Sequence, residues 1–342
     1  MPMERRITWK IISQSVDGPS HVRLGLPNQD CVRERQNKVT IVAVSDGHGS
    51  AKCFRSDIGA RFAAESALDV IESFFTGDWS GSSFTDESGT VTKEITQDWR
   101  RKVDEHLEKS PFTQQERDSL ASQHGQGTFS QIEKHPPIAY GATLITVAIS
   151  ADHILFLQLG DGDILAVDES GEVRRPVCSD NRLFANETTS LSSETAWKDF
   201  RTCCQFLPRG LPALILLSTD GYSNSFKDEA SFLKAGSDFL ALLRSEGGIE
   251  EVEKSLKEWL SDSSQMSGDD VTLSLVYRQS PELDSSPPFI AKLEREIDCH
   301  AVINDGGNSS QKLDICDGVG HTTETGGTAI RTVRSSSPPP ES

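Results

Sequence analysis

Short apolar runs, each ended by glycine or polar residues, recur along the 342-residue chain. Residues 39–44 (VTIVAV) are almost continuously apolar, which is typical of a strand buried on both faces. Residues 144–149 and 154–159 flank a short polar turn, a pattern that predicts a β-hairpin. Further strands are predicted at residues 7–16, 164–167, 214–218 and 271–277, with another opening at Asp30.

Three segments show the helical spacing of apolar residues. Residues 50–75 repeat apolar side chains every three or four positions, and residues 94–107 place Ile95, Trp99 and Val103 along one face. Residues 229–260 are also predicted to be helical. Residues 77–92 are rich in Gly, Ser and Thr and are expected to form a loop, while residues 113–137 are polar and weakly patterned. We therefore expect residues 77–137 to be a partly irregular insertion, with one helix between 113 and 137.

Tight turns between consecutive strands imply antiparallel pairing, so the pattern predicts an α+β layered fold rather than a parallel doubly wound sheet. Residues 1–280 are expected to form one domain. From about residue 281 to 342, Ser, Pro and Gly dominate, a composition that cannot bury enough apolar surface to fold alone. This tail is expected to be mostly disordered, with a short docked helix at residues 289–297.

The net charge narrows the functional classes. The chain carries 52 Asp and Glu against 34 Lys and Arg, a net charge of −18, which disfavours binding to nucleic acid. No apolar run approaches the roughly 20 residues that would span a membrane, and the first residues do not form a hydrophobic signal core. Seven cysteines without a C-x-x-C pair are typical of reduced thiols. A cytoplasmic location without membrane attachment is expected.

Aspartates recur where the predicted strands begin or end. Asp46, Asp161 and Asp220 each follow an apolar run and stand next to a glycine, and Asp269 immediately precedes another run. A single Asp-Gly pair is usually just a turn. Several carboxylates at the ends of core strands are costly to desolvate unless a partner neutralises them, and Lys and Arg are scarce nearby. Hard oxygen ligands of this kind favour magnesium or manganese.

Six short motifs follow one another in a fixed order. They are NQD at 28–30, VSDGHG at 44–49, GATL at 141–144, LGDG at 159–162, LSTDG at 217–221 and DDVT at 269–272. Their content and order resemble the PPM-type (type 2C) metal-dependent serine/threonine protein phosphatases over about residues 8–278. The opening with Gly18, His21, Pro27 and Asp30 is most similar to bacterial members.

This resemblance implies a fold, a cofactor set and residue roles. The fold would be a four-layer αββα sandwich, with two antiparallel β-sheets flanked by helices. Two Mg²⁺ or Mn²⁺ ions would activate a water against a phosphoserine or phosphothreonine ester. The implied ligands are Asp46, which bridges both ions, the Gly47 carbonyl, Asp30, Asp220 and Asp269, with Asp161 at a third, weaker site. His48 matches the general acid for the leaving group.

The chain also departs from the family pattern. Gln29 stands where many relatives carry Glu, and Asp270 replaces the Asn that usually follows Asp269. The register with Val271 and Thr272 makes Asp269 the expected ligand and Asp270 the second choice. Gly25 occupies the position at which eukaryotic relatives have a phosphate-binding Arg. His21 or Arg23 could bind the substrate instead, although Arg23 could equally be a solvated charge and His21 a histidine satisfied by a backbone carbonyl.

The expected partners are a phosphorylated protein substrate and a cognate Ser/Thr kinase, and the chain is expected to be a monomer. An alternative is a weak or inactive family member that binds phosphoproteins or a kinase as a regulatory module. The retained aspartates argue against that alternative. A two-metal nuclease is disfavoured by the acidic charge and by the absence of a basic stripe.

Overall fold

The computed structural model describes residues 7–77, 84–178, 189–207 and 210–279. Within these residues the strands form two five-stranded sheets, ordered β1-β10-β9-β6-β7 and β2-β3-β4-β5-β8. All strand pairs are antiparallel. The first sheet comprises β1 (Thr8–Val16), β6 (Asp163–Val167), β7 (Val173–Arg174), β9 (Leu214–Ser218) and β10 (Val271–Gln279). The second comprises β2 (Asp30–Gln36), β3 (Thr40–Asp46), β4 (Leu144–Ile149), β5 (His153–Leu159) and β8 (Arg201–Phe206).

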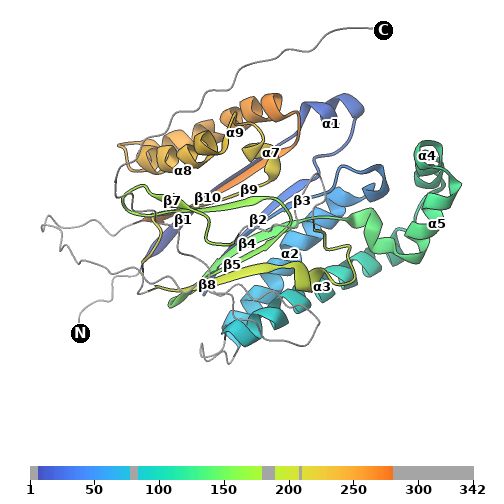
Figure 1. Cartoon of the computed structure of the whole chain (residues 1–342), viewed down its shortest axis with the longest axis horizontal. Helices are drawn as coiled ribbons and strands as arrows, with labels where there is room; N and C mark the ends of the chain where they lie inside the picture. The colour runs from blue at the N-terminus through green and yellow to red at the C-terminus, as the bar shows by residue number, and fades with distance from the viewer. Residues whose placement is uncertain (1–6, 78–83, 179–188, 208–209, 280–342) are drawn as a thin grey trace, which may run out of the picture. The chain divides into compact units, whose positions relative to one another are not determined.

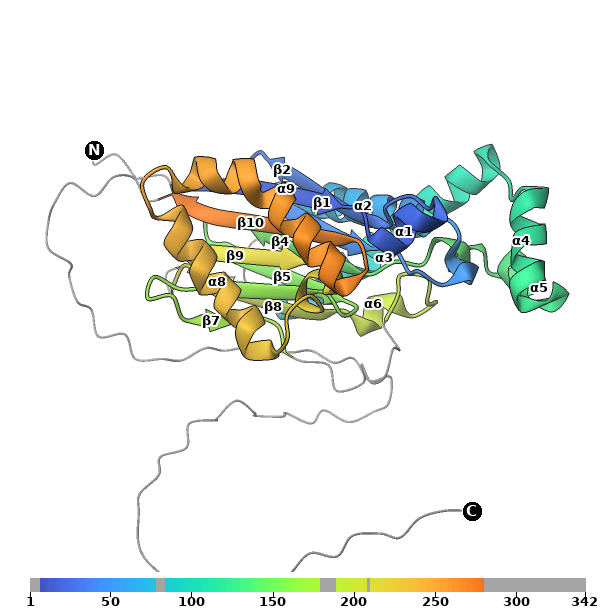
Figure 2. The same ribbon diagram turned by 90° about the horizontal axis from the view of Figure 1, so that it is seen from above.

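The helices lie on the outer faces of the two sheets. Figures 1 and 2 show α8 (Glu229–Leu243) and α9 (Gly248–Ser267) over the β9–β10 sheet, and α2 (Ser56–Thr76) and α3 (Phe84–Lys109) over the β3–β4 sheet. The remaining helices are α1 (Pro19–Leu24), η1 (Ala51–Cys53), α4 (Gln114–His124), α5 (Gln126–Lys134), η2 (Pro136–Tyr140), α6 (Ala196–Asp199) and α7 (Asp220–Ser223). This layering confirms the predicted four-layer αββα sandwich.

Alternation along the strands explains why both faces of each sheet are buried. In β3, Ile41 and Ala43 face the helices, whereas Val42 and Val44 face the opposite sheet. Because both sets of side chains are removed from water, the strand becomes the almost continuously apolar run seen in the sequence. The same two-sided burial holds for β4, whose six residues are all buried.

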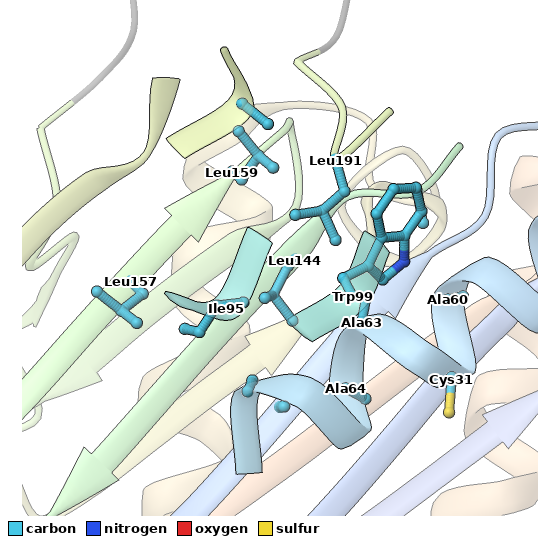
Figure 3. Packing of buried hydrophobic residues seen from close by; sticks show 14 of the residues in the cluster. Cys31, Ala60, Ala63, Ala64, Ile95, Trp99, Leu144, Leu157, Leu159 and Leu191 are labelled. Atoms are coloured by element: carbon cyan, nitrogen blue, oxygen red, sulfur yellow. The ribbon is translucent and has the colours of Figure 1, made fainter. Parts of the chain in front are cut away.

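Small residues of α2 let α3 approach closely. Ala60 and Ala63 face the fully buried Trp99 (Figure 3). The indole Nε1 of Trp99 donates to the Gly59 carbonyl at 2.9 Å, which satisfies the only polar atom of this buried side chain. A Cβ atom at Gly59 would lie 1.8 Å from the Tyr140 carbonyl oxygen, so this position requires glycine.

Several sequence expectations were wrong in detail. The loop predicted at 77–92 was wrong for residues 84–92, which belong to α3 (Phe84–Lys109), while residues 78–83 lie outside the described residues. The 113–137 segment holds two helices, α4 and α5, rather than one, and α4 begins with a capping box between Thr113 and Glu116. The turn expected at residues 17–20 leads into α1, with Pro19 at its first position. The short elements β7, α6 and β8 were not predicted.

The predicted tail at 281–342, with its helix at 289–297, lies outside the described residues. In the described part of the chain, no helix is both long enough and apolar enough to cross a membrane.

Candidate metal-binding and catalytic site

One end of the sandwich opens into a cavity of about 610 Å³. Four segments that are distant in the sequence supply carboxylates to its wall. The lining residues are Gln29, Asp46, Gly47, His48, Gly49, Ser50, Cys53, Asp161, Ser190, Asp220 and Asp269. The structure therefore brings together Asp46, Gly47, His48, Asp161, Asp220 and Asp269, all of which were singled out from the sequence.

Asp46 occupies the last position of β3, opposite Asp30 at the first position of β2. The backbone N–H of Asp46 donates to Thr143 Oγ1 at 3.0 Å, and the Thr143 N–H donates to the Asp46 carbonyl at 2.8 Å. The Ser45 hydroxyl donates to the Thr143 carbonyl at 2.6 Å. These bonds fix the end of β3 to the GATL segment and hence fix the position of the Asp46 carboxylate.

Glycines allow the backbone to turn into the cavity beyond Asp46. A Cβ at Gly47 would lie 2.6 Å from the Ser56 carbonyl oxygen and 2.7 Å from that of Gln29. A Cβ at Gly141 would lie 2.8 Å from the His48 ring. The backbone N–H of His48 donates to the Gly141 carbonyl at 3.1 Å. The His48 imidazole therefore lies against Gly141, where a side chain would displace it.

The other carboxylates come from turns at the same edge. Asp161 follows Gly160, whose φ of 99° forms the turn between β5 and β6. Asp220 begins α7 directly after β9. Asp269 follows Gly268, whose φ of 84° ends α9 and redirects the chain into β10. The positive φ angles explain the glycines next to these two aspartates, since other residues rarely adopt them.

The electrostatics of the cavity are dominated by uncompensated negative charge. Burial raises the pKa of Asp46 well above its usual range, and the charges of Asp30, Asp220, Asp269 and Asp161 add to this shift. Burial also raises the pKa of Asp220 to about 6, with further contributions from Asp161 and Asp269. Carboxylates that destabilise one another in this way would be stabilised by a bound cation.

The donor set fits hard divalent cations in its chemistry. The cavity is lined by carboxylate, amide, hydroxyl and carbonyl oxygens, and none of its lining residues is Lys or Arg. Gln29 Oε1 is buried there without a hydrogen-bond partner. Among the described residues, however, no three His, Cys, Asp or Glu side chains are gathered closely enough to hold an ion as they stand. The fit therefore rests on ligand type and charge.

Two candidate residues are held behind the cavity rather than in its wall. The Asp30 carboxylate accepts a hydrogen bond from Thr219 Oγ1 at 2.8 Å, and burial raises the pKa of Asp30 well above its usual range. Asp270 accepts hydrogen bonds from the N–H groups of Gly18 and Gln29, each at 2.6 Å. Asp269 lines the cavity, whereas Asp270 does not.

Neither proposed phosphate-binding side chain lines the cavity. His21 is paired with Asp270, with 2.8 Å between Nδ1 and Oδ2. Arg23 is exposed, and its Nη2 lies 3.4 Å from Ser20 Oγ. Ser50, Cys53 and Ser190 also line the cavity and were not predicted from the sequence. Ser50 and Cys53 lie close to the VSDGHG motif, but no sequence pattern indicated Ser190.

The comparisons with known proteins match this fold. The family model for protein phosphatase 2C matches residues 17–261. The structure of the serine/threonine phosphatase Stp1 from Staphylococcus aureus covers 82% of this chain and 99% of its own, at 14% identity and a TM-score of 0.52. PppA from Pseudomonas aeruginosa covers 80% of this chain and 99% of its own, at 16% identity and a TM-score of 0.50. A search of curated proteins gave no match.

At these identities the structural likeness shows the fold alone, while the family model spans well over half of the chain. The chain belongs to the protein phosphatase 2C family.

Proposed function

We propose that this chain is a metal-dependent protein serine/threonine phosphatase, a phosphoric monoester hydrolase. One observation carries the proposal: Asp46, Asp161, Asp220 and Asp269, from four separate segments, share one cavity with His48. Such a concentration of like charge in one cavity costs stability unless a cation neutralises it, and groups perturbed in this way gather at functional sites. Membership of the protein phosphatase 2C family supports the same chemistry.

The donor set suits two Mg²⁺ or Mn²⁺ ions, and a third at a weaker site. Asp46, the Gly47 carbonyl, Asp220 and Asp269 would hold the two ions directly, Asp30 would contribute through a water from behind the cavity wall, and Asp161 would contribute to the third ion. Bound there, the cations would neutralise phosphoryl oxygens and lower the pKa of a water nucleophile.

The protein's own residues would bind the phosphate ester and donate a hydrogen bond to its leaving oxygen. No lining residue is Lys or Arg, so neutral groups such as the Ser50 and Ser190 hydroxyls and the Gln29 side-chain amide would donate to the phosphoryl oxygens. Burial lowers the pKa of His48, although the Asp161 charge opposes this shift. A neutral His48 ring can donate its N–H hydrogen bond to the leaving serine or threonine oxygen, which lowers the cost of its developing charge.

The proposal is tested by phosphate release from a phosphoserine peptide and from p-nitrophenyl phosphate, with manganese and with chelator. We expect turnover only with metal, and at least about a hundredfold loss in Asp46→Asn and in Asp220→Asn. Wild-type rates in either variant would contradict the proposal. Folded protein with no turnover at any metal concentration would favour the alternative, a regulatory module that binds phosphoproteins or a kinase.

The biological setting follows from the same proposal. A phosphatase of this kind would act on phosphorylated proteins and would oppose a cognate Ser/Thr kinase. We further propose that it works as a monomer in the cytoplasm. Gel filtration of the full chain tests the monomer, and fractionation of cells tests the location.

A further inference from the structure

Two chain segments set the position of the His48 side chain. On one side, the Gly47 backbone packs so closely against the Ser56 carbonyl that a Cβ at Gly47 would lie 2.6 Å from its oxygen. On the other side, the Gly141 carbonyl accepts the backbone N–H of His48 at 3.1 Å, and a Cβ at Gly141 would lie 2.8 Å from the imidazole. The relative position of Ser56 and Gly141 therefore decides where the imidazole lies.

Arg55, next to Ser56, connects these two segments by two hydrogen bonds. Its backbone N–H donates to the Ala139 carbonyl at 2.8 Å, and its Nη1 donates to the Tyr140 hydroxyl at 2.7 Å. Tyr140 directly precedes Gly141 in the sequence. Both Arg55 and Tyr140 are buried, so the bond between their side chains is formed away from water, where a hydrogen bond is electrostatically stronger.

The Arg55 guanidinium is fixed in one orientation because all five of its N–H donors are used. Besides the bond to Tyr140, Nε and Nη2 donate to the two oxygens of Glu116 at 2.7 and 2.9 Å. The remaining donors bond to the Ser110 carbonyl at 2.7 Å and the Pro111 carbonyl at 3.1 Å. A lysine has three donors and no planar fork, so it cannot reproduce this set of bonds.

We propose that Arg55 is a positioning residue that, through Tyr140, holds the His48 imidazole where it donates to the leaving oxygen. Arg55 does not line the candidate catalytic cavity and acts only through its neighbours. The inference rests on the proposed phosphatase function and on the role of His48 in it. It also gives the first turn of α4, which carries Glu116, a part in supporting catalysis.

The test compares a substrate with a poor leaving group and one with a good leaving group. The serine alkoxide needs the hydrogen bond from His48, whereas p-nitrophenolate is stable as an anion and gains little from it. We expect Tyr140→Phe and Arg55→Lys to lower kcat for a phosphoserine peptide about three- to thirtyfold with KM nearly unchanged, and to lower kcat for p-nitrophenyl phosphate by less than about twofold. The matched control is Arg35→Lys, whose ion pair with Glu72 lies near the far end of β2 and whose rates should not change.

A merely structural role of Arg55 predicts equal losses for the two substrates, and that result overturns the proposal. In a His48→Ala background, Tyr140→Phe should cause no further loss, because its effect is transmitted through the imidazole. A full loss in that background contradicts the proposal as well. Should Arg55→Lys fail to fold, Tyr140→Phe, which removes only a hydroxyl, carries the same test.

Exchange of the His48 amide hydrogen, followed by NMR on the full chain, tests the positioning without turnover. We expect exchange to be about three- to tenfold faster in Tyr140→Phe, because the Gly141 carbonyl that accepts this hydrogen is held less firmly. Exchange as slow as in wild type overturns the proposal. If exchange responds as expected but wild type hydrolyses neither substrate, the phosphatase function fails while the positioning of His48 by Arg55 is supported.

Discussion

His21 and Asp270, 249 residues apart in the sequence, lie with Nδ1 and Oδ2 2.8 Å apart. The Asp270 side chain is only 2% exposed. Its two oxygens also accept the N–H groups of Gly18 and Gln29. One buried carboxylate therefore joins the segment that leads into Asp30 to the turn that carries Asp269, and two candidate ligands depend on this connection.

Replacing His21 by alanine should destabilise the fold by about 1–3 kcal/mol, because the change leaves a buried carboxylate short of one partner. Thermal unfolding of the chelated protein measures the effect. Arg23→Ala, in the same helix but exposed, is the matched control and should change stability by no more than about 0.5 kcal/mol. Equal melting temperatures for the two variants would show that the His21–Asp270 pair does not contribute to the stability of the fold.

The clustered carboxylates should make the metal-free protein less stable as pH rises. The pKa of folded Asp220 is raised to about 6 from its usual value near 3.8, so the folded state binds more protons than the unfolded state between these values. Stability therefore falls as pH increases through this window and stays low above it. At pH 7.5, Asp220→Asn should stabilise the chelated protein by about 1–2 kcal/mol while impairing function.

The measurement is the difference in melting temperature between Asp220→Asn and wild type in chelator at pH 7.5 and at pH 4.5. The difference should be large at the higher pH and should shrink at the lower pH, where wild-type Asp220 is protonated. A variant that is less stable than wild type at pH 7.5 would contradict the electrostatic account of the cavity.

Replacing either of two helical glycines by alanine should change the free energy of unfolding, but in opposite directions. Gly59→Ala places a methyl group 1.8 Å from the Tyr140 carbonyl oxygen and should cost about 1–3 kcal/mol. Gly127→Ala, at an exposed position of α5, meets nothing within 4 Å and should stabilise by about 0.5–1 kcal/mol through helix propensity. Urea unfolding of both variants gives the comparison. If both variants change the free energy of unfolding by a similar amount in the same direction, α2 does not pack tightly against Tyr140.

The core strands could be predicted because two-sided burial leaves a continuous apolar run, as in residues 39–44. The elements that were not predicted bury less apolar surface than the core strands do. Among the described strands β8 pairs only with β5, at an edge of the sheet, and five of its six residues are intermediate or exposed, so the strand has no clear apolar face. The helix α4 buries only Leu120, although its capping box at Thr113 and Glu116 was a usable signal.

The candidate site was predictable where a strand end fixes the residue, and less so elsewhere. Asp46, Asp161 and Asp220 each follow an apolar run within three residues, so their shared edge could be expected. The choice between Asp269 and Asp270 depends on which neighbour is taken up by His21, and no local pattern reveals a partner 249 residues away. Ser190 lines the cavity only through tertiary packing, which the sequence around it does not encode in a recognisable motif.

The central claim is that the aspartate cavity holds divalent cations. Anomalous diffraction at the manganese edge, on crystals of the full chain soaked in Mn²⁺, tests it most directly. We predict strong anomalous peaks within coordination distance of the carboxylates of Asp46, Asp220 and Asp269, and none there in Asp46→Asn crystals. An ordered wild-type cavity without an anomalous peak, at manganese concentrations that saturate any catalysis, would contradict the account.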